Sequence, residues 1–135
     1  MTARDLPARL IIELLRSGQR VAFSARGSSM WPAIPSRSRL EIDPCGAAEL
    51  RVGEVAAFER SGTVVVHRVT RVTATGVHFQ GDALKREDGC IPIADVLGRA
   101  RVLERRPLSV RLPRPADIRR ALRALRQLLT SWRAR

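Results

Sequence analysis

The chain has 135 residues, a formal net charge of +12, 44% hydrophobic residues and 4% aromatic residues. This length suits one domain with a modest core, and no run of about 18 or more apolar residues is present to span a bilayer. The charge comes almost wholly from arginine, since Lys85 is the only lysine, and it is compatible with nucleic acid, an anionic membrane surface or an acidic partner. Nucleic acid is the least expected partner, because aromatic residues for base stacking are scarce and no helix-turn-helix or zinc pattern accompanies the arginines.

The first residues predict a helix rather than a secretory signal. Residues 5–17 carry apolar side chains at helical spacing, while Asp5 and Glu13 break the continuous apolar run that a signal peptide needs. Pro7 suits the first turn of this helix, and Ser17-Gly18 suits its end. The expected compartment is therefore the cytoplasm. The predicted apolar stripe comprises Leu6, Leu10, Ile11, Leu14 and Leu15.

Short alternating runs then predict a series of strands. The longest run, residues 63–73, is rich in β-branched residues and follows Ser61-Gly62, which is a hairpin signal. Further strands are predicted at residues 21–24, 40–43, 53–58, 76–80 and 96–103, with a polar loop at residues 82–90. In the longest strand, alternation places Val64, Val66, Arg68, Thr70 and Val72 on one face and Val65, His67, Val69, Arg71 and Thr73 on the other.

These elements predict a mainly β fold, a compact antiparallel β domain flanked by an N-terminal and a C-terminal helix. The β domain with its N-terminal helix is expected to cover residues 1–106, and residues 107–135 form a proline linker and a basic amphipathic helix. We expect the apolar stripe of residues 116–133 to pack on the β domain, on the N-terminal helix or on another subunit. The alternatives are peripheral contact with the inner membrane face or with an acidic partner.

Ser29 lies in a segment that suits neither a helix nor a strand interior. Gly27 permits backbone angles that other residues resist, and Pro32 disfavours helical geometry at Trp31. The hydroxyl of Ser29 is therefore expected at a tight break in the chain, where it is presented rather than buried. The simpler interpretation of the same residues is an ordinary turn.

A serine nucleophile needs a base, and the chain offers two histidines and one lysine. His67 lies in the middle of the longest strand, where an imidazole is costly unless it is hydrogen-bonded, and His78 lies in a short strand beside Phe79. Asp82 or Asp88, both in the following loop, could orient the imidazole, and both are equally good turn formers. The residues alone leave these alternatives open.

The two cysteines predict neither a disulfide framework nor a metal site. Cys45 and Cys90 are too few for the first and lack the C-x-x-C spacing for the second. We expect two free, partly buried thiols, and the sequence points to no cofactor and no metal.

Five short segments resemble, in order, the successive boxes of the type I signal peptidase family. Each is weak alone, but their order over roughly residues 20–104 is a strong signal. The segments are GSSMWP (27–32), LRVGEV (50–55), VHRV (66–69), GD (81–82) with Asp88, and VLGR (96–99).

The resemblance implies a β-rich peptidase and distinguishes between the family's branches. The bacterial enzymes and the related self-cleaving repressors use a serine and a lysine, but His67 occupies the position of that lysine here, as in the archaeal and endoplasmic-reticulum branch. By this match Ser29 is the nucleophile, His67 the general base and Asp88 the orienting acid. Asp82 corresponds to a second acidic position, more structural or supportive. The resemblance also implies an oxyanion site that uses the Ser29 N–H.

One departure from the family bears on function. Signal peptidases are normally anchored by a transmembrane segment, and no such segment is present in this sequence. The expected function is therefore a small soluble serine endopeptidase that acts on a peptide or protein substrate. The alternatives are a non-catalytic peptide-binding module of the same fold, and an adaptor that binds a membrane surface or an acidic partner through its basic C-terminal helix.

Overall fold

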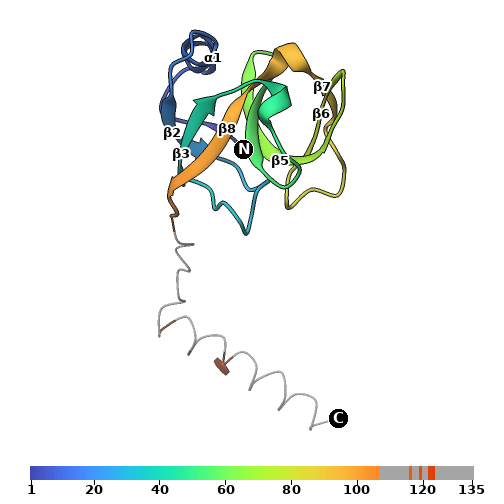
Figure 1. Ribbon diagram of the computed structural model, residues 1–135. Helices are drawn as coiled ribbons and strands as arrows, with labels where there is room; N and C mark the ends of the chain where they lie inside the picture. The colour runs from blue at the N-terminus through green and yellow to red at the C-terminus, as the bar shows by residue number, and fades with distance from the viewer. Residues whose placement is uncertain (107–115, 117–118, 120–121, 124–135) are drawn as a thin grey trace.

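A computed structural model describes residues 1–106 together with Ala116, Arg119, Leu122 and Arg123. Its strands form one curled, antiparallel sheet in the order β1-β2-β3-β8-β4-β5-β6-β7, with the helix α1 at one end (Figure 1). The strands are β1 (Thr2–Ala3), β2 (Val21–Arg26), β3 (Arg39–Pro44), β4 (Val55–Arg60), β5 (Thr63–Val72), β6 (Gly76–Gln80), β7 (Gly89–Pro92) and β8 (Val96–Glu104). The helix α1 covers Ala8–Arg16, and short 3-10 turns cover Ala47–Glu49 and Ile93–Asp95.

The prediction of a mainly β, antiparallel domain is confirmed, and the hairpin between β4 and β5 shows why the local signals worked. Ser61 and Gly62 have φ angles of 50° and 74°, so both central residues of the turn are left-handed, as a two-residue hairpin requires. The β5 prediction is correct as far as Val69 but wrong beyond it. Val69 pairs with Phe79 and Arg71 pairs with His78, so Thr70 is an extra residue that breaks the alternation.

The helix prediction needs a correction to its buried face. Pro7 lies just before α1 rather than in its first turn, and the buried residues are Ile11, Ile12 and Leu15. Leu10 is 41% exposed, although helical spacing placed it in the stripe. The helix packs on the sheet through Ile11, Ile12 and Leu15, so a narrower apolar face than the predicted one is buried.

Two elements and one thiol differ from the predictions. The strands β1 and β7 were not predicted, and β7 takes up Cys90, which was assigned to the polar loop. Cys45 and Cys90 are both free; Cys45 is half-buried, but Cys90 is exposed.

The predicted linker and the predicted helix at residues 116–132 lie outside the described residues, except for Ala116, Arg119, Leu122 and Arg123, which are helical. None of the helices in the described part of the chain has the length and apolar character to cross a membrane.

The core has two hydrophobic clusters, and β5 contributes to both. Val64 and Val66 belong to the cluster that α1, β2 and β3 cover, and Val69 belongs to the cluster built around Phe58 and Phe79. Alternation along β5 therefore turns His67 away from Val66 and towards the Phe58 cluster. In the middle of β5, the polar side chain of His67 is therefore buried against packed apolar residues such as Phe58.

Candidate active site

Ser29 lies in a sharp turn between the end of β2 and the buried residue Met30. The strand β2 ends at Arg26, Gly27 has a φ of 105°, and the Trp31 amide donates to the Ser28 carbonyl at 3.0 Å to close the turn. Met30 is fully buried in the larger cluster, which fixes the backbone directly after the serine. Ser29 itself is half-buried, so its hydroxyl lies at the edge of the core.

His67 lies opposite this turn, in the middle of β5. Its side chain is 5% exposed, and its ring meets the ring of Phe58 edge-on with 6.1 Å between centroids. Pairing of His67 with Ala56 of β4 fixes the backbone beneath the ring. A polar ring this deeply buried requires hydrogen-bond partners on both nitrogens.

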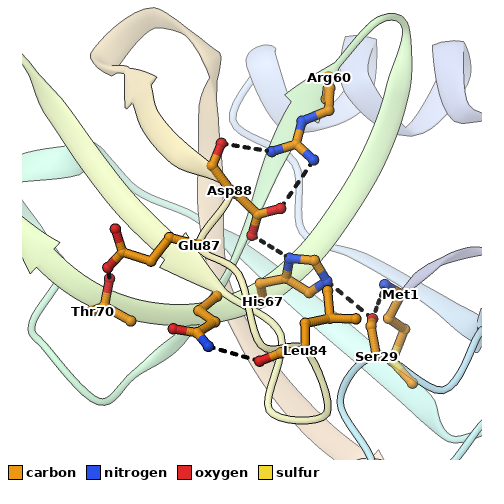
Figure 2. A network of polar contacts seen from close by, with 9 residues as sticks. Met1, Ser29, Arg60, His67, Thr70, Leu84, Glu87 and Asp88 are labelled. Atoms are coloured by element: carbon orange, nitrogen blue, oxygen red, sulfur yellow. Dashed lines mark hydrogen bonds and ion pairs between the residues drawn. The ribbon is translucent and has the colours of Figure 1, made fainter.

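Both partners are present, and they join three side chains in one line (Figure 2). His67 Nε2 lies 3.0 Å from Ser29 Oγ, and His67 Nδ1 lies 2.6 Å from Asp88 Oδ2. A carboxylate only accepts hydrogen bonds, so Nδ1 carries the ring proton and Nε2 is left to accept from the Ser29 hydroxyl. The structure therefore orients the imidazole as a base towards Ser29.

The loop between β6 and β7 holds both ends of this line. The Asp88 amide donates to the Phe79 carbonyl at 2.8 Å, and the Ala83 amide donates to the Ser29 carbonyl at 2.9 Å. A Cβ added at Gly81 would lie 2.8 Å from the Ser29 carbonyl oxygen, closer than real Cβ atoms approach backbone. This loop therefore sets the position of the serine as well as that of the acid.

We expect Gly81→Ala to lower the rate of any reaction at Ser29 by about 10²-fold, because a shift of about 1 Å at a reacting group costs that much. The added methyl group must push the Ser29 carbonyl or Leu84 aside. The measurement is kcat/KM together with the free energy of unfolding. Gly62→Ala is the control for a glycine substitution, since its Cβ would meet nothing within 4 Å; its φ of 74° costs stability without moving Ser29. Equal activity of Gly81→Ala and the wild type would contradict the positioning role.

Asp82 is not part of this line. Its two carboxylate oxygens accept from Arg68 at 2.8 and 2.7 Å, and Arg68 also donates to the Gly53 carbonyl at 2.8 Å. Asp88, and not Asp82, is therefore the partner of His67. His78 lies elsewhere, with Arg71 at 3.0 Å from its Nε2 and Glu87 at 3.6 Å from its Nδ1.

Two further groups contact the line and were not found from the sequence. Arg60, at the end of β4, lies 3.0 Å from Asp88 Oδ1 and donates to the Asp88 carbonyl at 3.3 Å. The α-ammonium group of Met1 donates to Ser29 Oγ at 2.7 Å. Both contacts join residues 28 positions apart, and no local pattern in the sequence marks either of them. Their effect is that every hydrogen-bonding atom of Asp88 and of the Ser29 hydroxyl has a partner.

The surroundings favour the neutral form of His67. Burial lowers the pKa of this imidazole below its ordinary 6.5, and the positive charges of the Met1 ammonium and Arg60 act in the same direction. Asp88 opposes them by hydrogen bond and by charge. Burial also lowers the pKa of the Met1 amine below its ordinary 8.0, again opposed by Asp88. A neutral base at position 67 is therefore available at neutral pH.

This shift predicts the pH dependence of both stability and activity. The unfolded chain binds a proton at His67 near pH 6.5 before the folded chain does, so the free energy of unfolding falls as the pH drops below 6.5. The acid limb of kcat/KM is expected to have its midpoint below pH 6.5, because the reaction needs neutral His67. Denaturant titrations and initial rates between pH 4 and 8 measure the two effects. A rate midpoint above pH 6.5 would contradict the expected shift.

The remaining features are a surface hollow and the backbone amide of Ser29. A hollow of about 510 Å³ adjoins Asp88 and is otherwise lined by five exposed residues, Arg60, Leu84, Lys85, Arg86 and Glu87. Within the described residues the Ser29 amide donates no backbone hydrogen bond. Among the same residues, no group of three or more His, Cys, Asp or Glu side chains could hold a metal ion.

A hydroxyl, an imidazole and a carboxylate in this order can make the serine a nucleophile for acyl transfer. Neither the protein-family models nor the curated proteins give a match to this chain.

Proposed function

We propose that the chain is a serine peptidase of the type I signal peptidase class, which cleaves a peptide or protein substrate through an acyl-enzyme on Ser29. The observation that carries this proposal is the continuous line of contacts from Ser29 Oγ through His67 to Asp88. A serine in a turn and a buried histidine are each common in proteins. An ordinary turn, however, does not need its serine to contact an imidazole whose other nitrogen is held by a carboxylate. The proposed fold is accordingly that of a signal-peptidase-like β domain with flanking helices.

Each residue has a defined task in this mechanism. Ser29 Oγ attacks the carbonyl carbon of the scissile bond while His67 Nε2 takes the hydroxyl proton, and Asp88 stabilises the resulting imidazolium. The Ser29 amide donates to the oxyanion that forms. His67 then returns the proton to the leaving amine as the C–N bond breaks. Water, deprotonated by His67, attacks the Ser29 ester, and cleavage of the ester returns the proton to Ser29.

Further residues of the resembling segments, besides the three catalytic groups, support the proposal by pairing with one another. Glu54 of LRVGEV lies 3.0 Å from Arg99 of VLGR, and Arg68 of VHRV binds Asp82 of the GD segment. The Arg51 amide and Arg99 lower the pKa of the Glu54 carboxyl, and Asp82 raises the pKa of Arg68. These two pairs, between residues 14 and 45 positions apart, thus join four of the five resembling segments.

The test of this function is cleavage of a defined peptide library. Purified wild-type chain is incubated with the library, and new termini are identified by mass spectrometry; His67→Ala, which keeps Ser29 but removes the base, is processed in parallel. We expect a reproducible set of termini that His67→Ala does not produce. Cleavage by both proteins would indicate a contaminating peptidase. Binding of library peptides without cleavage by either protein would instead identify a non-catalytic peptide-binding module.

A further inference from the structure

Residues 1–3 lie between the two strands that lead to Ser29 and His67. The strand β1 pairs with β2 through Thr2–Arg26 and Ala3–Ala25, next to the turn that carries Ser29. On its other side, the Val66 amide, which directly precedes His67, donates to the Met1 carbonyl at 2.9 Å. In the view of Figure 1 the N-terminus lies near the middle of the curled sheet. Met1 is only 5% exposed and belongs to the larger hydrophobic cluster.

We propose that residues 1–3 are an internal blocking strand, seated where an extended peptide binds, and that the substrate must displace them to reach Ser29. This inference rests on the proposed peptidase function. Its partner class is the extended backbone of a peptide, which would pair with the same groups of β2 and β5.

Residues 1–3 supply partners to backbone groups of both β2 and β5. The Met1 carbonyl accepts from the Val66 amide at 2.9 Å, and Thr2 and Ala3 pair with Arg26 and Ala25 of β2. Departure of the segment leaves these strand-edge groups without partners unless another extended chain replaces it. Strand addition is a common way for proteins to bind a peptide, since its main chain supplies matching donors and acceptors.

The Met1 ammonium also acts directly on the nucleophile and on the base. Its hydrogen bond at 2.7 Å occupies the oxygen that must attack the substrate. The reaction also creates a positive imidazolium on His67, and the nearby ammonium opposes that charge, as it already lowers the pKa of the ring. The site with residues 1–3 in place is therefore a resting form, and their removal frees both the nucleophile and the base.

A reversible disulfide between β1 and β2 tests the proposal. Thr2 and Arg26 are directly opposed, and the Cα separation of such pairs, about 4.5–5.5 Å, suits a disulfide. The variant is Thr2→Cys with Arg26→Cys, in a chain that also carries Cys45→Ala and Cys90→Ser. We expect the oxidised protein to cleave the peptide library at least tenfold more slowly than the same protein after reduction. Equal rates in the two states would overturn the proposal.

The matched control is a second disulfide that spans two strands away from the site. Glu41 of β3 and Arg101 of β8 are also directly opposed, and Glu41→Cys with Arg101→Cys is made in the same background. Oxidation of this control is expected to leave the rate within about twofold. An equal loss of rate in both proteins would overturn the claim that holding residues 1–3 in place is what slows cleavage.

A second measurement separates this inference from the proposed function, because it needs no turnover. Wild-type chain whose intact mass retains Met1 is labelled briefly with an amine-reactive acetyl ester, with and without a fully acetylated casein digest. The side chain of Lys85, the only lysine and an exposed residue, is the internal reference. We expect the digest to raise labelling of the Met1 amine at least fivefold relative to Lys85. Unchanged labelling under a saturating digest would overturn the blocking strand, whether or not the chain cleaves peptides.

Discussion

Replacing Ser29 by alanine is expected to lower kcat/KM for peptide cleavage by about 10⁴-fold or more. Ser29 Oγ is the atom that would attack the substrate, and it is the group that His67 Nε2 contacts at 3.0 Å. Without it the imidazole has no hydroxyl to deprotonate, and any residual rate comes from water. The measurement is the initial rate on a peptide selected from the library, with wild type and variant purified side by side.

The control must show that the loss is chemical rather than structural. Ser17→Ala removes a serine whose hydroxyl caps the end of α1 by donating to the Leu14 carbonyl, away from the line of contacts. It should keep full activity. Ser29→Ala also leaves the Met1 ammonium without its acceptor, so we expect its free energy of unfolding to fall by about 1–3 kcal/mol. A folded Ser29→Ala protein with wild-type activity would refute the peptidase proposal.

Much of the fold was predictable because its strands carry local signals. The two left-handed residues of the Ser61-Gly62 turn and the β-branched run after it are sufficient to predict the β4–β5 hairpin. The strands β1 and β7 carry no comparable signal. β1 has two residues and exists because β2 and β5 offer it partners, so only the tertiary structure creates it.

The site was predictable in part, and β5 explains why. His67 and Arg68 are neighbours on an alternating strand, so their side chains leave opposite faces, and each takes a different carboxylate from the same loop. The sequence identifies both Asp82 and Asp88 as candidates. Which of them reaches His67 and which reaches Arg68 depends on the path of the loop, and no local pattern predicts that path. Met1 and Arg60 approach the site from distant segments, and nothing near them in the sequence indicates this position.

Asp88→Asn is expected to lower kcat/KM by about 10⁴-fold at neutral pH, by forcing the wrong tautomer on His67. Arg60 lies 3.0 Å from Asp88 Oδ1, so the amide oxygen of the asparagine will turn towards the guanidinium and its NH₂ group towards His67. The ring nitrogen Nδ1 must then accept a hydrogen bond, and the ring proton moves to Nε2, which can no longer accept from Ser29. Asp82→Asn is the matched control: it breaks the pair with Arg68, costs about 0–1 kcal/mol of stability, and leaves the rate within about fivefold.

A changed tautomer of His67 and a simple loss of the Asp88 charge predict different results for a double variant. If Arg60 fixes the orientation of the asparagine, Asp88→Asn with Arg60→Leu frees the amide to turn its oxygen towards Nδ1 and restores the productive tautomer. We therefore expect the double variant to be at least tenfold more active than Asp88→Asn alone, although Arg60→Leu in the wild-type background should lower activity, since Asp88 loses a partner. Initial rates for the four proteins measure this coupling. Additive losses would mean that Asp88 acts through its charge alone and that Arg60 does not set the tautomer of His67.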